Sequence, residues 1–218
     1  MIQIENISKS YPSRKTTVEA LKDINLKIDK SEFVLIKGES GSGKSTLLYL
    51  IGGLLKPSSG NIRVNDISIL DLSASASAKY RVHSVGFVFQ SYHLLPYLNV
   101  IDNIMLANKI DGIIISKKDV MIILDDIGIE ERAFHYPSQL SAGEKQRVAL
   151  ARAMITNPSI ILADEPTGNL DEKNANFVLS YLKRYQEAGG TVVLVTHGRL
   201  PESYATRIIK LDKGKVIN

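Results

Sequence analysis

The feature that most restricts the possible folds of this chain is a glycine-rich segment, GESGSGKST, at residues 38–46. The apolar run Phe33–Lys37 precedes it and the run LLYLIGGLL follows it, so the segment joins a predicted strand to a predicted helix. Its G-x-x-x-x-G-K-[ST] spacing is typical of a phosphate-binding loop. The candidate phosphate-binding residues are Gly38, Glu39, Ser40, Gly41, Ser42, Gly43, Lys44, Ser45 and Thr46.

This residue pattern has a physical reason. Glycines let the backbone approach phosphate oxygens, and the free N–H groups at a helix start donate to them. Lys44 is expected to neutralise the β and γ oxygens of a nucleotide, and Ser45 to ligate Mg²⁺. An ordinary glycine-rich turn would not explain a Lys and two hydroxyl groups at this point. We therefore expect nucleotide binding.

Short β-rich runs alternate with helical patterns, which predicts an α/β domain with a mainly parallel central sheet. Several of the runs are continuously apolar, as is usual for strands covered on both faces. The expected strands are Ile2–Ile7, Ile24–Ile28, Phe33–Lys37, Val85–Gln90, Ile160–Asp164, Thr191–Thr196 and Arg207–Leu211.

The middle of the chain has a different pattern, in which helices follow one another with few strands. We expect helices over Asn99–Lys109 and Ser116–Ile127, the second opened by the capping-box-like sequence SKKD. The low-complexity stretch Ser73–Ala78 is interpreted as a surface turn or helix start. The sequence therefore predicts a helical subdomain inserted into the α/β core.

Polar side chains follow three of the apolar strands. Asp164 and Glu165 end the strand in SIILADEPTGNLD, Gln90 follows SVGFVF, and His197 follows TVVLVT. Ligands of α/β sheets bind at the carboxyl ends of the strands, so these side chains can meet one nucleotide. We expect Asp164 to hold Mg²⁺ and Glu165 to orient the attacking water, with Gln90 and His197 as candidates for the metal and the γ-phosphate.

Composition excludes several classes of protein. With 44% apolar and 23% charged residues in 218, the chain is typical of a folded globular protein, and no apolar run approaches the ~18 residues of a membrane span. The N-terminal MIQIENISKSY lacks the pattern of a signal peptide, and cysteine is absent. The net charge of +4 is dispersed, so nucleic acid binding is not expected.

A second helix start offers donors to an anion, in LSAGEKQRVALARA at residues 140–153. Ser141 and Glu144 also fit a capping box, which is an ordinary helix start. Taken together, the phosphate loop, Gln90, this segment, ADEPTGNLD and His197 occur in an order that resembles the ATP-binding cassette (ABC) ATPase family over nearly the whole chain.

The resemblance implies a P-loop NTPase fold with a mainly parallel core sheet, an antiparallel β subdomain and an inserted α-helical subdomain. It implies one domain over 1–218, with a core of 1–89 and 158–218 and a helical part at about 91–157. It also implies a head-to-tail dimer that encloses two ATP molecules with Mg²⁺. Each helix carrying LSAGE would then close over the other subunit's ATP.

Residue by residue, the resemblance assigns Tyr11 to stacking on adenine, and Ser141 and Gly143 to the partner's γ-phosphate. Gln90 would contact Mg²⁺ with Ser45 and Asp164. The candidate catalytic residues are Glu165, His197, Lys44 and Asp171, where Asp171 communicates across the dimer and His197 clamps the γ-phosphate.

This sequence departs from the family pattern at Lys37, Ala142, Glu144 and Gly198. Glu144 adds negative charge near a polyphosphate, which costs affinity unless Lys145 or Arg147 offsets it. None of the departures removes a group that the chemistry requires, so we expect an active but slow ATPase.

Within the family, ADEPTGNLD and VGFVFQSYHLLPYLNVIDNI resemble the subgroup of lipoprotein release, macrolide export and cell division. We therefore expect a separately encoded membrane permease that docks near Gln90, and a peripheral location on the cytoplasmic face of the membrane. The alternatives are a soluble ABC ATPase acting on ribosomes or DNA, which would carry two cassettes or a long coiled coil, and a P-loop kinase or GTPase, which would not explain LSAGEKQRVALARA.

Overall fold

Two β-sheets organise the structure, a computed structural model that describes residues 1–12, 17–107 and 112–217. Six strands in the order β10-β9-β3-β8-β7-β6 form one sheet, and four in the order β2-β1-β4-β5 form the other. The strands are β1 Ile2–Pro12, β2 Thr17–Ile28, β3 Phe33–Lys37, β4 Ser59–Val64, β5 Ile67–Ser68, β6 Val85–Phe89, β7 Ile160–Asp164, β8 Thr191–Thr196, β9 Arg207–Asp212 and β10 Lys215–Ile217.

The six-stranded sheet is parallel from β9 through β6, and only β10 runs antiparallel to its neighbour. Its central strands β7 and β8 are buried at every position, which explains their continuous apolar runs. The predicted bounds of β3, β7 and β8 are confirmed, and those of β6 and β9 differ by one residue.

The four-stranded sheet pairs antiparallel and was only partly predicted. Here β1 continues to Pro12 and β2 begins at Thr17, well before the predicted Ile24. No strand was predicted at Ser59–Val64, where the structure has β4. These segments contain exposed and polar positions, and they extend because β1 offers hydrogen bonds on both edges.

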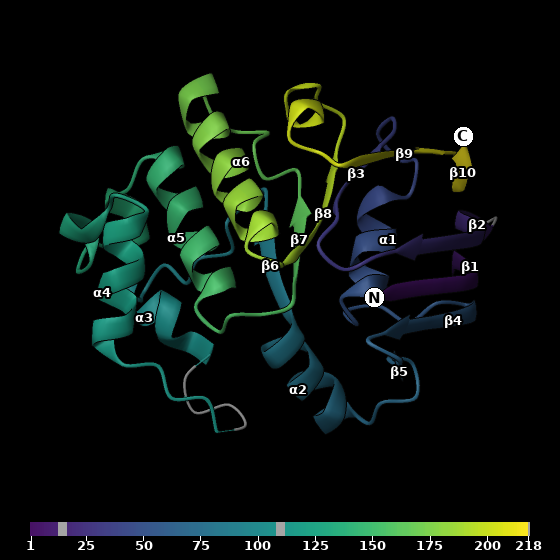
Figure 1. The fold of residues 1–218 in the computed structure, drawn as a ribbon, viewed down its shortest axis with the longest axis horizontal. Coiled ribbons are helices and arrows are strands. Elements are labelled where there is room, and N and C mark those ends of the chain that lie inside the picture. Colours follow the sequence, from purple (N-terminus) through teal and green to yellow (C-terminus); the bar gives the residue numbers. More distant parts are fainter. Residues whose placement is uncertain (13–16, 108–111, 218) are drawn as a thin grey trace.

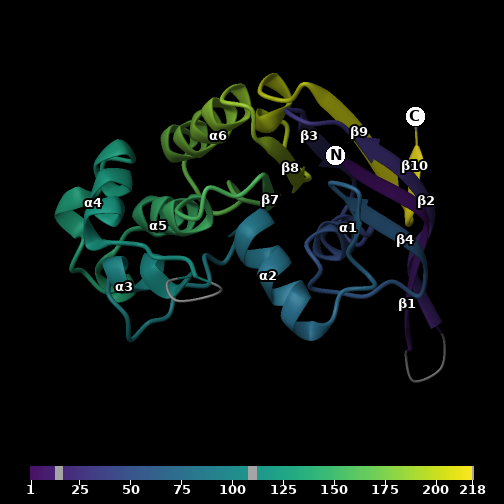
Figure 2. The same cartoon turned by 60° about the horizontal axis from the view of Figure 1, so that its bottom comes forward.

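Helices cover the six-stranded sheet on both faces. On β3, Val34 and Ile36 face the core that contains α1, whereas Phe33 and Leu35 face the core that contains α6. Figures 1 and 2 show α1 and α6 on opposite sides of β7 and β8. The helices are α1 Lys44–Ile51, α2 Ala74–Ser84, α3 Val100–Ile104, α4 Lys117–Asp126, α5 Ala142–Met154 and α6 Glu172–Glu187, with 3₁₀ turns η1 Met105–Ala107, η2 Glu130–Arg132, η3 Pro137–Gln139 and η4 Leu200–Ser203.

The inserted helices α3, α4 and α5 share a third apolar core, and Figures 1 and 2 show them at the end of the molecule away from the antiparallel sheet. The predicted helix Ser116–Ile127 is α4, and its capping box with Asp119 is present. The predicted helix Asn99–Lys109 is α3 followed by η1, and its last two residues lie outside the described residues. Ser73 caps a full helix, α2, through a hydrogen bond to its side chain from the N–H of Ala76.

Across the described ranges, none of the helices has the length and apolar character needed to cross a membrane.

Candidate nucleotide-binding site

The phosphate loop connects β3 to α1 in a path that requires glycine. Gly43 has φ of 102°, and a Cβ on it would lie 2.4 Å from the carbonyl oxygen of Ala20. Gly43 is also the N-cap of α1, with no side-chain cap and no acidic residue in the first turn. The first N–H groups of α1 are therefore not capped by a side chain, and they are open to an anion.

Lys44 begins α1 with its side chain curled back across the loop. Its ammonium donates to the carbonyl oxygens of Gly38 (2.9 Å) and Glu39 (2.8 Å), and only 7% of the residue is exposed. Both contacts are neutral carbonyls, so within the described residues the positive charge has no anionic hydrogen-bond partner. The charge is available to a phosphate group.

A cavity of about 560 Å³ lies at this loop and is large enough for a nucleotide's phosphates. Residues from five separate segments of the sequence line it. These are Ala20; Glu39, Ser40, Gly41, Gly43, Lys44, Ser45 and Thr46 of the loop; Gln90; and Glu165 and His197.

Asp164 lies at the end of β7 beside the start of α1. Its Oδ1 accepts a hydrogen bond from Ser45 Oγ (2.9 Å) and its Oδ2 accepts one from Tyr49 Oη (2.7 Å). Burial, together with the bond to Asp164, raises the pKa of the Tyr49 hydroxyl well above its usual value of 10. Tyr49 therefore remains a donor that holds one carboxylate oxygen while the other faces Ser45.

This pairing fits Mg²⁺. Mg²⁺ in nucleotide sites takes one or two protein oxygens and completes its shell with phosphates and water, so no larger cluster of acidic groups is required. The described residues contain no such cluster. The hydroxyl of Ser45 and the carboxylate of Asp164, already side by side, supply the type of oxygen ligand that this ion needs.

Glu165 is held by the end of the neighbouring strand β8. Its Oε2 accepts from Thr196 Oγ1 (2.6 Å), and its Oε1 accepts from the His197 backbone N–H (3.0 Å) and contacts His197 Nδ1 (2.7 Å). Its backbone is in the left-handed region, with φ of 46°. Glu165 lines the cavity, and residues with such an unusual backbone conformation are common at functional sites.

Gln90 lies on the cavity wall next to the turn that follows Glu165. A Cβ on Gly168 would lie 2.8 Å from Gln90 Nε2, so glycine at 168 makes room for this amide. The side chain of Gln90, which follows β6, therefore packs closely against the turn that follows β7.

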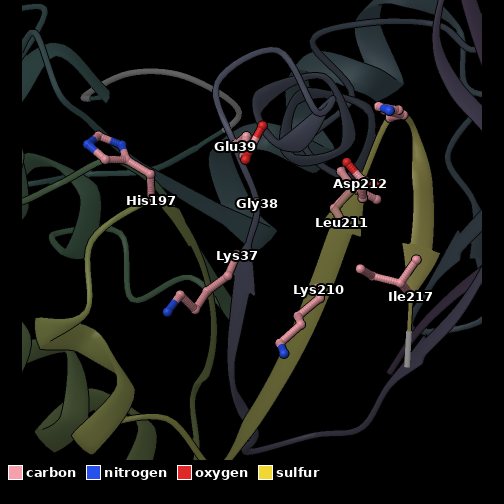
Figure 3. A pocket seen from close by; sticks show the side chains of 9 residues that line it. Lys37, Gly38, Glu39, His197, Lys210, Leu211, Asp212 and Ile217 are labelled. Atoms are coloured by element: carbon pink, nitrogen blue, oxygen red, sulfur yellow. The ribbon is translucent and has the colours of Figure 1, made fainter.

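A second cavity, of about 580 Å³, adjoins the first because both are lined by Glu39 and His197. Figure 3 shows Lys37 and Lys210 pointing the same way from neighbouring strands in this cavity. Lys37 forms an ion pair with Glu202, so the unexpected lysine before the phosphate loop is neutralised there. Gly38 lines this cavity rather than the first.

The second helix start, at α5, is closed by its own side chains. Ser141 Oγ accepts from the Glu144 N–H (3.3 Å) and Glu144 Oε2 accepts from the Ser141 N–H (2.8 Å), so the expected capping box is present. Ser141 is exposed, whereas Gly143 is buried against Asn174. Neither residue lines the cavity at the phosphate loop.

The charge of Glu144 is balanced by a residue that the sequence did not indicate. Arg132 Nε donates to Glu144 Oε1 at 2.7 Å. Arg147, which the sequence offered for this purpose, instead donates to the carbonyl of Ile127 and to Asn174. Of the two candidates, Lys145 and Arg147, Arg147 therefore does not offset Glu144, because its guanidinium lies against α6.

Asp171 is the N-cap of α6. Its carboxylate accepts from the Asn174 backbone N–H and from Asn174 Nδ2, both at 2.8 Å, and these bonds lower its pKa. Since Asn174 also contacts Gly143 and Arg147, Asp171 is connected to α5 through one side chain.

Besides Gly38, Asp164, Ser141 and Gly143, two more predicted ligands, Tyr11 and Ser42, are absent from the lining of the phosphate-loop cavity. Tyr11 lies on β1, with the Lys9 ammonium 5.1 Å from its ring centre. Ser42 is buried, and its Oγ has no hydrogen-bond partner among the residues that the structure describes.

Sequence reasoning also missed Tyr49 and Thr196, which hold the two carboxylates. A signal existed for Thr196, a hydroxyl beside His197 at a strand end. None existed for Tyr49, one of several large residues on α1.

Comparison with known proteins places this geometry in context. The family model described as "ABC transporter" matches residues 21–168. The lipoprotein-releasing system ATP-binding protein LolD of Geobacter metallireducens is 40% identical over 100% of this chain and 98% of its own length. The macrolide export ATP-binding/permease protein MacB of Chlorobium phaeobacteroides is 39% identical, and this chain covers 33% of it.

A solved structure has the same fold throughout. The ATP-binding cassette MJ0796, a dimer in a post-hydrolysis state bound to ADP and Pi, aligns with a TM-score of 0.94 and 40% identity, over 100% of this chain and 97% of that one.

Proposed function

This chain belongs to the ABC transporter family and is an ATP-binding cassette ATPase, and we propose the following roles for its residues and partners. The observation that carries the proposal is the position of Glu165, a carboxylate held by Thr196 and His197 on the wall of the cavity that Lys44 and Ser45 also line.

Lys44 and the N–H groups at the start of α1 bind the phosphates of ATP. Lys44 would exchange its two carbonyl acceptors for phosphate oxygens, which are better partners for an ammonium group. Ser45, Asp164 and Gln90 hold Mg²⁺, which supplies Lewis-acid stabilisation of charge on the phosphates when it is bound.

Glu165 orients the attacking water and accepts its proton. Its carboxylate is fixed from two sides by Thr196 and His197, so it needs little reorganisation to act. His197 contacts Glu165 through Nδ1, which leaves Nε2 on an exposed ring to donate to the γ-phosphate. The chemistry at this site is hydrolysis of ATP to ADP and phosphate.

Ser141 and Gly143 complete the site of a second copy of this chain. They carry a helix start of the type that binds anions, yet neither lines the phosphate-loop cavity of their own subunit. A two-fold dimer would resolve this by presenting α5 of each subunit to the partner's ATP. Asp171 is connected to α5 through Asn174, so a movement of α5 on contact with the partner would be transmitted to α6.

A membrane permease docks beside Gln90, and a cavity of about 320 Å³ supports this location. Its wall is largely apolar, with Phe87, Phe89 and the exposed Leu106. Arg152, also on the wall, donates to the carbonyls of Tyr92 and His93 just after Gln90. A segment bound here would therefore act on the loop that carries Gln90.

The location that follows is the cytoplasmic face of the membrane, with a separate permease as the driven subunit. MacB carries an ATP-binding part and a permease in one protein, and this chain covers a third of it. We retain Tyr11 as the adenine-stacking residue, since β1 places it with an exposed ring.

Affinity purification of a tagged Glu165→Gln variant from solubilised host membranes tests these roles. Without its water-activating carboxylate the variant should bind ATP, remain dimeric and retain a membrane protein. The matched control is the same purification with ADP, which should release the partner copy. A variant that stays monomeric with Mg-ATP contradicts the composite site, and recovery of ribosomes or DNA without a membrane protein contradicts the permease.

A further inference from the structure

The start of α5 combines two features that oppose each other. A helix N-terminus attracts phosphate through its N–H groups and dipole. The same turn contains a carboxylate, Glu144, which repels phosphate. The α1 start at the phosphate loop has no acidic residue in its first turn.

Glu144 is not free to swing away from this turn. Its Oε2 is used by the Ser141 N–H and its Oε1 by Arg132 Nε. These bonds lower the pKa of Glu144 to about 2, so protonation does not relieve the charge at neutral pH.

Arg132 comes from η2, outside the helix, and is the only ion-pair partner of Glu144 within the described part of the chain. Two cations of α5 were also candidates for this task. Lys145 forms no ion pair with Glu144 among the described residues. The Arg147 guanidinium instead stacks on the Phe177 ring at 3.8 Å and bonds to Asn174.

We infer that Arg132 is a positioning residue for assembly of the composite site: by pairing with Glu144 it cancels the carboxylate's charge, so that the start of α5 accepts the triphosphate held by a second copy. This inference rests on the proposed dimer. It predicts that dimerisation requires Arg132 while residue 144 carries a negative charge, and no longer requires it when residue 144 is neutral.

The contribution is set by Coulomb's law. An unmasked carboxylate near several phosphate charges at a protein surface should weaken ATP-driven dimerisation by about ten- to a hundredfold at low salt, and by less at high salt. Binding of ATP to the monomer should not change, because Arg132 does not line the phosphate-loop cavity.

The test uses the Glu165→Gln chain as parent and adds Arg132→Met, Glu144→Gln or both. Gln at 144 can still accept from the Ser141 N–H, so the capping box survives. The matched control is Arg184→Met, which breaks the exposed Arg184–Asp126 ion pair. Sedimentation equilibrium with Mg-ATP at low and high salt gives the dimer constant, and a fluorescent ATP analogue gives monomer affinity.

We expect Arg132→Met alone to weaken the dimer, and the double variant and the control to resemble the parent. The defect should shrink as salt is raised. A dimerisation constant unchanged by Arg132→Met overturns the inference. A defect that persists in the double variant also overturns it, because Arg132 would then act through the packing of its side chain and not through its charge. A parent that stays monomeric with ATP overturns the composite site itself, and the inference with it.

Discussion

The two helix starts, at α1 and α5, both have backbone N–H donors in their first turn but differ in how these donors are used. At α1 the N-cap is Gly43, no side chain accepts from the first turn, and Lys44 adds a positive charge. At α5 Ser141 and Glu144 cap each other, and the acidic charge is matched by Arg132. The first start leaves its donors open to an anion, whereas the second is closed by its own side chains and, in the proposed dimer, would meet the phosphates held by a partner.

The largest difference should appear on removing the first-turn lysine of each helix. We expect Lys44→Met to lower ATP turnover by about a hundredfold or more, because the donor to the phosphates is lost. Lys145→Met, at α5, should leave ATP binding by the monomer unchanged. Steady-state hydrolysis and a fluorescent ATP analogue measure both, and equal losses in the two variants would mean that the starts are not distinct.

The next difference concerns the glycines. Gly43→Ala forces a side chain into the left-handed region at a cost of about 1–2 kcal/mol, and its Cβ meets the backbone of Ala20. Gly143→Ala meets the side chain of Asn174, which can move. We therefore expect Gly43→Ala to destabilise the chain more in urea denaturation and to abolish ATP binding. A larger loss of stability from Gly143→Ala would contradict this order.

A smaller effect is expected behind the α1 start. Tyr49→Phe removes the donor to Asp164 Oδ2, and leaving a carboxylate oxygen without its hydrogen bond costs about 1–3 kcal/mol. We expect turnover to fall several-fold and the Mg²⁺ concentration needed for half-maximal turnover to rise. Tyr80→Phe is the control, because its hydroxyl bonds the carbonyl of Ile51 instead. A Mg²⁺ titration that is the same for both variants would argue against the role of Tyr49.

The capping boxes of α4 and α5 allow a matched pair. Ser116→Ala and Ser141→Ala should each lower the free energy of unfolding by about 1 kcal/mol, because each removes one cap. Only Ser141→Ala should weaken the ATP-bound dimer in the Glu165→Gln background. If Ser116→Ala weakened it equally, the effect would be one of stability alone.

The smallest effect depends on pH. Folding lowers the pKa of Glu144 from about 4.5 to about 2, mainly through Arg132, so the folded chain binds this proton less readily than the unfolded chain. Its contribution to stability is present above about pH 4.5 and is lost as the pH falls towards 2. Urea denaturation across this window should show a shallower pH dependence for Glu144→Gln than for the parent.

Much of the fold could be predicted because the patterns are local. The buried strands β3, β7 and β8 are continuous apolar runs, and Ser116 and Ser141 each precede an acidic residue by three positions. The antiparallel strands could not be predicted in full, since Ser59–Val64 becomes a strand by pairing with β1.

The sequence by itself determined the phosphate loop, the two carboxylates at the end of β7 and the two helix starts, because each depends on residues a few positions apart. The tertiary structure alone decided which groups hold them. Tyr49 reaches Asp164 across 115 positions, Thr196 reaches Glu165 across 31, and Arg132 reaches Glu144 across 12. These side chains meet only because the helices and strands that carry them pack together. That packing depends on many weak contacts between residues far apart in the sequence, which a local pattern does not predict.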